Sequence, residues 1–170
     1  GVERYVVEAG GLTGIQVLPD DEIEIINNEG NQICEISVFN KDGKSELAIL
    51  GLKEIKDNSE IKKILFKKDE TSLQALLQLK KRNLNIEKSK SSIIFDNKTK
   101  AGESTKLKSK DKCYCIIAAP CKEMNIHEQN PPTELTVMIK RSIIKEDKEF
   151  SLIPDPVYDP SNEINIARTT

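Results

Sequence analysis

Hydrophobic and polar residues alternate along much of the first forty residues, and turns interrupt the pattern at short intervals. In residues 22–26 the side chains of Ile23 and Ile25 fall on one face, as the two-residue period of a strand requires. Residues 5–8, 15–18 and 32–39 are also strand-like. Turn sequences about every ten residues are typical of antiparallel structure. The pattern therefore predicts a run of antiparallel strands.

The middle of the chain changes to a helical period. Ile61, Ile64 and Leu65 follow Asn58-Ser59, a pair suited to capping a helix. Leu73, Leu76 and Leu77 form a second apolar face. Thr71 precedes this face, and Gln74 follows three residues later, which is the spacing of a capping box. The spacing predicts helix over residues 59–84, in one or two pieces.

The later part of the chain again favours strands. Residues 98–112 are polar and rich in lysine, which indicates a loop or an exposed hairpin. The continuous apolar run 113–119 predicts a buried strand. In residues 134–140 the apolar side chains alternate with polar ones, which predicts another strand. We therefore expect a β-rich α+β fold: an antiparallel sheet or small barrel, with one or two helices from the middle of the chain.

The two ends of the chain favour a piece of a longer protein. The sequence begins with Gly1 rather than Met. Residues 153–170 contain Pro154, Pro156 and Pro160 and little apolar periodicity, as in a semi-rigid spacer. We expect residues 1–152 to form a single β-rich accessory domain, and residues 153–170 to be an exit linker toward a missing downstream domain.

Composition narrows the function classes. The net charge is −2, which argues against a general nucleic-acid binder. No apolar run approaches the ~20 residues that a membrane-spanning helix needs, and no signal peptide is evident. Four cysteines at low density favour reduced thiols and a cytoplasmic location.

The residues with metal-binding chemistry are Cys113, Cys115, Cys121 and His127. Cys113 and Cys115 lie two apart in a predicted strand, so their side chains share a face, whereas zinc ligands are usually two to four residues apart on a turn. Buried thiols acting as small hydrophobic groups are the simpler interpretation. Cys121 and His127 form a conceivable nucleophile–base pair, but no third group orients them. We assign no catalytic residue.

Two further motifs favour turns over sites. Residues 10–14 are rich in glycine but lack the Lys-Ser/Thr of a phosphate-binding loop, and no helix follows them. The adjacent acids Asp20, Asp21 and Glu22 lack the alternating spacing of a calcium loop, so a solvated turn is expected there. The lysine pairs near residues 62–68 are interleaved with acids, as on an ordinary helix surface.

Three segments together carry a family resemblance: residues 30–35 (GNQICE), 118–124 (AAPCKEM) and 132–141 (PTELTVMIKR). In this order they resemble the N-terminal region of long glycine-cleavage T-protein (aminomethyltransferase)-like proteins. The first segment is also similar to a strand of the urea-carboxylase-associated domain family. Cys121 departs from the pattern, because a glycine is expected after Ala-Pro.

The resemblance implies a role in one-carbon or glycine metabolism. It implies tetrahydrofolate for the parent protein and no cofactor in this domain, because the folate-binding and catalytic residues of that family belong to another domain. None of them is carried over to this chain. The partners it implies are the downstream domains of the same chain, with no nucleic acid and no membrane.

Three functions follow as hypotheses. The first is a non-catalytic accessory domain that packs against following domains, which predicts an exposed apolar patch. The second is a small metal-binding or metal-dependent enzyme domain using Cys34, Cys121 and His127. The third is a small-ligand-binding β-barrel.

Overall fold

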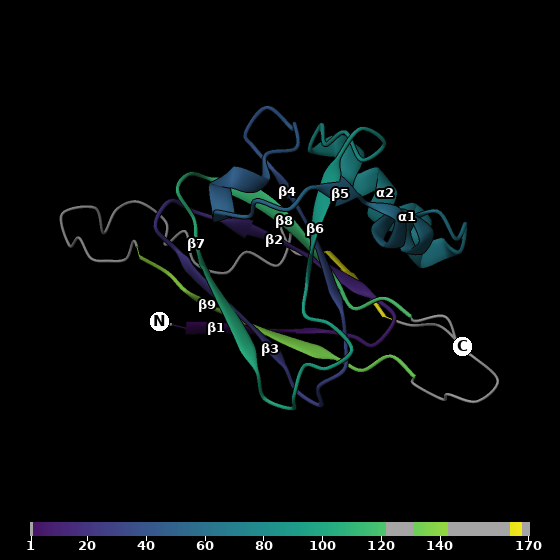
Figure 1. The fold of residues 1–170 in the computed structure, drawn as a ribbon. Coiled ribbons are helices and arrows are strands. Elements are labelled where there is room, and N and C mark those ends of the chain that lie inside the picture. The colour runs from purple at the N-terminus through teal and green to yellow at the C-terminus, as the bar shows by residue number, and fades with distance from the viewer. Residues whose placement is uncertain (1, 122–130, 143–163, 168–170) are drawn as a thin grey trace.

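The fold is built from two antiparallel sheets and two helices (Figure 1). The computed structural model describes residues 2–121, 131–142 and 164–167. The β-rich α+β class predicted from the sequence is confirmed. The sequence pattern is compatible with an antiparallel sheet or a small barrel. The structure has two antiparallel sheets that pack face to face.

The four-stranded sheet has the order β1-β9-β3-β7, and every neighbouring pair is antiparallel. Its strands are short and regular, and their odd- and even-numbered residues point to opposite sides. Tyr5, Ile23 and Val137 are among those that point into the core. The strands are β1 (Val2–Val7), β3 (Glu22–Asn27), β7 (Ser104–Lys108) and β9 (Leu135–Lys140).

The six-stranded sheet has the order β10-β2-β8-β4-β6-β5 and is covered on both faces. In β8, Cys115 and Ile117 face the core between the sheets, whereas Tyr114 and Ile116 face the helices. This is why its sequence is continuously apolar, as predicted. The strands are β2 (Leu12–Val17), β4 (Cys34–Phe39), β5 (Lys56–Asp57), β6 (Lys90–Ile94), β8 (Cys113–Ala118) and β10 (Ile164–Ile166).

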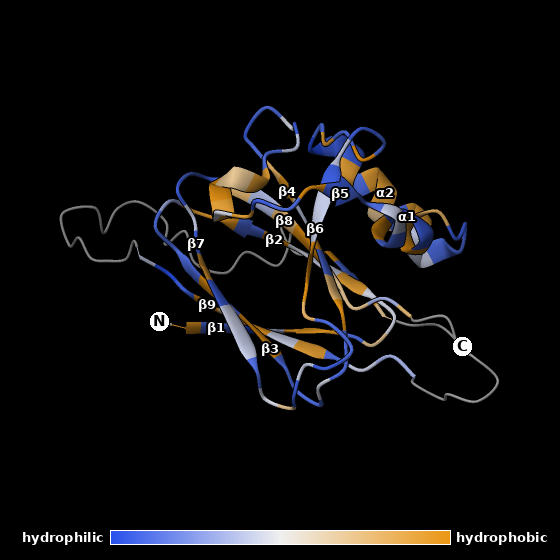
Figure 2. Ribbon diagram, in the orientation of Figure 1, coloured by the Kyte–Doolittle hydropathy of each residue, from blue (hydrophilic) through white to orange (hydrophobic). Residues whose placement is uncertain are grey.

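The predicted helical window forms α1 (Ser59–Leu65) and α2 (Glu70–Lys81), which lie on the outer face of the six-stranded sheet (Figure 1). A short 3-10 helix, η1 (Leu47–Leu50), also contributes to the core between the sheets. Figure 2 shows hydrophobic residues along the strands and on the helices where these layers meet.

The apolar face predicted for α2 is only partly the buried one. Ala75 and Leu79 are buried, but Leu73 and Leu77 are 50% and 59% exposed. The helix packs through a face rotated from the leucine stripe, and the small Ala75 lets it approach the sheet. The predicted capping box is also wrong, because Asp69 caps α2 and accepts a hydrogen bond from Ser72 N at 2.8 Å.

Two segments with weak strand signals supply edge strands. The polar stretch 98–112, expected to be a loop or an exposed hairpin, contains β7, which pairs with β3. Residues 164–166, which the proline pattern placed in a linker, form β10 and pair with β2, burying Ile164 and Ile166. Residues 153–163 and 168–170 lie outside the described residues, so the division into domain and linker stays a prediction.

Candidate functional site

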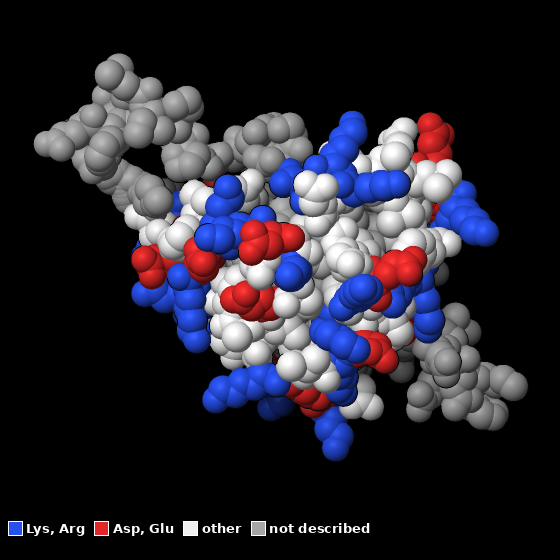
Figure 3. Space-filling view, turned by 90° about the horizontal axis from the view of Figure 1, so that it is seen from above, with Lys and Arg blue, Asp and Glu red and all other residues white. Residues whose placement is uncertain are grey.

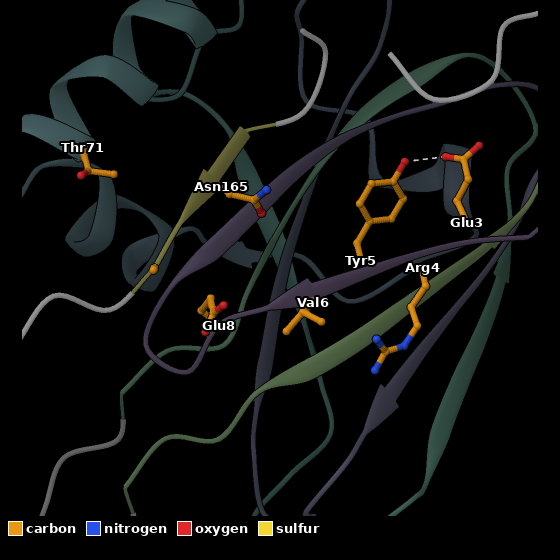
Figure 4. Close-up of a pocket in the computed structure, with 8 residues that line it drawn as sticks. Glu3, Arg4, Tyr5, Val6, Glu8, Thr71 and Asn165 are labelled. Carbon is orange, nitrogen blue, oxygen red and sulfur yellow. Dashed lines mark hydrogen bonds between the residues drawn. The ribbon is translucent and has the colours of Figure 1, made fainter. Parts of the chain in front are cut away.

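A large groove runs along the exposed edge of β1 (Figure 4). Its volume is about 700 Å³. One wall comes from β1 and the turn after it, and the other from α2 and β10. We call it the β1–β10 groove, and it is lined by Glu3, Arg4, Tyr5, Val6 and Glu8 on one side and Thr71, Asn165 and Ala167 on the other.

The groove follows the main-chain edge of β1 rather than one of its faces. Glu3 and Tyr5 project to one side of the strand, and Arg4 and Val6 to the other (Figure 4). All four nevertheless line the same groove. Because neighbouring strand residues point to opposite faces, a groove that they all border must lie along the strand edge.

Glycine allows the opposite wall to come close. A Cβ atom on Gly11 would lie 1.9 Å from the carbonyl oxygen of Ile166 in β10, which no side chain tolerates. Beside it, the Thr13 hydroxyl oxygen lies 2.7 Å from Asn165 Oδ1 and 3.3 Å from the carbonyl oxygen of Val6. This glycine-rich segment, which the sequence assigned to a turn or bulge, thus holds β1, β2 and β10 together.

A buried ion cluster lies at the start of β1. Arg141 donates to both carboxylate oxygens of Glu3, at 2.8 and 2.9 Å, and to Asp21 Oδ2 at 2.7 Å. The Arg141 and Glu3 side chains are only 10% and 12% exposed, and Asp21 is fully buried. Asp21 was expected in a solvated turn. That expectation is wrong, because Asp21 also accepts the N–H groups of Leu18 and Ser142 and so closes the turn from inside.

The pairing decides the charge state of this cluster. Burial alone would raise the pKa of Glu3, but the hydrogen bonds from Arg141 and Tyr5 and the charge of Arg141 outweigh it and lower that pKa. Burial alone would lower the pKa of Arg141, yet the hydrogen bonds and charges of Glu3 and Asp21 raise it. The pairing therefore favours the charged forms of Glu3 and Arg141, which suits the cluster to structure rather than proton transfer.

The cysteines do not form one site. Cys113 and Cys115 share a buried face, as predicted, with their sulfur atoms 3.8 Å apart. Cys34 is fully buried in the same core, and burial raises the pKa of its thiol well above the ordinary value. Cys121 is exposed, and His127 lies outside the described residues.

The candidate metal ligands stay a prediction, because His127 lies outside the described residues. A cysteine binds a metal as the thiolate, and burial raises the pKa of the Cys34 thiol. Within residues 2–121, 131–142 and 164–167, no three His, Cys, Asp or Glu side chains come together as a metal site.

Glu35 is a buried carboxylate that sequence patterns missed. It lies on β4 and accepts a hydrogen bond from Ile61 N, in the first turn of α1, at 2.6 Å. Burial raises its pKa, although this hydrogen bond opposes the rise. Asn58, the expected cap of α1, makes no side-chain cap; its amide instead donates to Ile86 O at 2.9 Å. The sheet, rather than the local sequence, caps this helix.

Gln32 is a second buried polar residue with a structural role. Its amide nitrogen donates to Pro120 O at 3.0 Å, and its amide oxygen accepts from Thr133 N at 2.9 Å. Its main-chain oxygen accepts from Asn27 Nδ2 at 2.7 Å. One buried side chain thus joins residues 30–35, 118–121 and 132–141, which are the described parts of the three segments that carry the family resemblance.

The chain resembles part of a much longer enzyme. It is 33% identical, over 171 residues, to the trimethylamine-oxide aldolase of Ruegeria pomeroyi. The similarity covers 100% of this chain but 21% of that protein, so the chain spans about a fifth of the relative's length. No protein-family model matches the chain.

One face of the molecule shows mixed charge. Figure 3 shows basic and acidic side chains intermingled over the face seen from above, as the interleaved lysines and acids of the sequence predicted. Among the helices that the structure describes, none is long and apolar enough to cross a membrane.

Proposed function

We propose that this chain is a non-catalytic, N-terminal accessory domain of a longer, folate-dependent aminomethyltransferase-like protein in one-carbon metabolism. The observation that carries the proposal is the similarity along the whole chain to a fifth of a much longer enzyme. That relative is named for trimethylamine oxide, the N-oxide of a methylated amine, and tetrahydrofolate carries one-carbon units. The name of the relative and the proposed cofactor therefore point toward the same area of metabolism.

Two features of the domain support a packing role. Leu73 and Leu77 lie one helical turn apart on α2 with half or more of their surface exposed. Phe66, just after α1, is 40% exposed. Apolar side chains gathered on a surface favour contact with another protein surface, and in this proposal the contact is with following domains of the same chain.

The lining of the β1–β10 groove does not suit tetrahydrofolate. Its charged side chains are Glu3, Arg4 and Glu8, and Arg141 already holds the Glu3 carboxylate, so the groove offers no excess of positive charge for the carboxylates of a folate. The ring in the groove belongs to Tyr5, which is buried and donates its hydroxyl to Glu3 at 2.5 Å. In this proposal folate binds to another domain, and no step of its chemistry involves this chain.

The test compares this chain with the full-length product of its gene. We expect the full-length protein to bind tetrahydrofolate in calorimetric titration and to consume trimethylamine oxide or another methylated amine in its presence. The isolated chain should bind none and show no turnover. Turnover by the isolated chain, or a full-length protein without affinity for folate, would overturn the proposal.

A thermal-shift screen of the isolated chain tests the small-ligand alternative. We expect folates and methylated amines to leave its melting temperature unchanged. A rise in proportion to ligand concentration would favour a ligand-binding domain instead.

A further inference from the structure

The edges of the two sheets, as far as the described residues form them, are not protected equally. β5 and β10 are only two and three residues long. β7 carries Lys106 and Lys108 on its exposed positions. Short edge strands and edge lysines are devices by which proteins prevent the pairing of a sheet with another chain.

β1 is longer than β5 and β10 and is uninterrupted, although it also carries two charged side chains, Glu3 and Arg4. It has six residues without proline or glycine, and its register with β9 is continuous from Val2 to Val7, so no bulge interrupts it. Val2 is 60% exposed at its start. This regular edge is the one that the β1–β10 groove follows.

The main-chain groups of β1 that face the groove can be identified. The carbonyl oxygen of Val6 lies 3.3 Å from the hydroxyl oxygen of Thr13 on β2, and therefore on the side of β1 away from β9. Strand residues alternate, so Arg4 directs its N–H and carbonyl to the same side. Within the described ranges we find no main-chain partner on that side for the N–H of Arg4 or Val6.

The position of the groove relates it to the ends of the chain. Glu3 lines it near the start of the described residues, and Ala167 lines it at their end. Glu3 and Ala167 are each within three residues, along the sequence, of an end of the chain, so a segment joined at either end would be tethered close to the groove. Such attachment raises the effective concentration of a neighbouring segment there.

We propose that the β1–β10 groove receives an extended segment from the remainder of the same polypeptide, which adds to β1 as a new edge strand. The pairing is by main-chain hydrogen bonds to the N–H and carbonyl groups of Arg4 and to the N–H of Val6, because the Val6 carbonyl already accepts the Thr13 hydroxyl. The inference rests on the proposed function in one respect, since the partner is the rest of a longer chain. To the proposed function it adds the surface that makes the contact and the way in which the two segments pair.

Hydrogen exchange measured by mass spectrometry at residue resolution tests this pairing. The amides of Arg4 and Val6 should exchange quickly in the isolated chain and at least about a hundredfold more slowly in the full-length protein. The exposed edge amides of β7 serve as the internal control and should exchange alike in both. Equal exchange of Arg4 and Val6 in the two proteins overturns the inference.

A pair of variants in the full-length protein separates main-chain from side-chain effects. Arg4→Pro removes the N–H that faces the groove, whereas Arg4→Ala keeps it and removes only the side chain. Val6 should lose its protection in Arg4→Pro and keep it in Arg4→Ala, while Tyr5 and Val7 stay protected by β9 in both. If Arg4→Pro unfolds β1, hydrogen exchange in the unmodified isolated chain and the unmodified full-length protein still tests the inference.

Other outcomes distinguish the two proposals. Protection that appears elsewhere on the domain in the full-length protein, with β1 unprotected, overturns this inference and leaves the accessory role intact. Identical exchange over the whole domain in the isolated chain and the full-length protein overturns the accessory role as well as the strand addition. Protection of β1 that rises with the concentration of the isolated chain assigns the edge to a second copy and also overturns the inference.

Discussion

At the scale of single residues, stability at the start of β1 depends on a buried ion cluster. Arg141 pairs with Glu3 and Asp21, and all three are shielded from water. Removing one member of such a cluster leaves the others buried and uncompensated, which costs far more than the loss of an exposed pair.

We expect Arg141→Ala to lower the free energy of unfolding by about 3 kcal/mol. Arg4→Ala, on the same sheet but exposed, is the matched control and should change it by less than about 0.5 kcal/mol. Urea denaturation at pH 7 measures both. Similar losses in the two variants would contradict the assignment.

The same cluster predicts a dependence on acid. The pKa of Glu3 is lower in the folded than in the unfolded chain, so its contribution is present above about pH 4.5 and is lost as the pH falls through the folded pKa. The unmodified chain should therefore lose more stability than Glu3→Gln between pH 5 and pH 3 in the same denaturation experiment.

At the scale of elements, helix α1 depends on a group from the sheet. Its seven residues are too few to be stable alone, and Glu35 of β4 accepts the N–H of Ile61. The stability of α1 therefore depends on a contact with the sheet rather than on contacts within the helix.

Two substitutions at Glu35 should behave differently. Glu35→Ala leaves the Ile61 amide unpaired and should cost about 1–3 kcal/mol. Glu35→Gln keeps an acceptor and removes the ionisation. Because the pKa of Glu35 is raised on folding, the unmodified chain loses stability as the pH rises above about 4.5. The stability of Glu35→Gln relative to the unmodified chain should therefore grow from pH 4 to pH 7; a constant difference would contradict the raised pKa.

The sequence predicted what depends on local pattern and missed what depends on distant partners. Alternation in Leu135, Val137 and Ile139 predicted the buried face of β9 because a strand has the same period wherever it packs. Asp21 was misassigned because its partner, Arg141, is 120 residues away. The leucines of α2 were misread because the orientation of a helix on a sheet depends on the sheet as well as on the helix. The groove could not be predicted at all, since its walls come from three segments far apart in the sequence: β1, α2 and β10.

At the scale of the whole molecule, Gln32 connects parts of the chain that lie far apart. It bonds to Pro120 and Thr133, which are 88 and 101 residues away. We expect Gln32→Ala to lower the free energy of unfolding by about 3 kcal/mol, because buried main-chain groups lose their partners. Gln78→Ala on the exposed side of α2 is the control. Chemical denaturation measures both variants, and the free energy of unfolding of the control should change little. A loss in Gln32→Ala no larger than in the control would contradict this role.

The pairing of β1 with β9 and of β2 with β10 also has a consequence for synthesis of the protein. Val2 lies opposite Lys140, and Leu12 lies opposite Ile166. On a ribosome β1 therefore emerges more than a hundred residues before β9, and β2 emerges about a hundred residues before β8, the earlier of its two partners. Such late, long-range pairing slows folding and leaves strand edges exposed to other nascent chains. Both strands therefore have no sheet partner until the later strands of the domain have been translated.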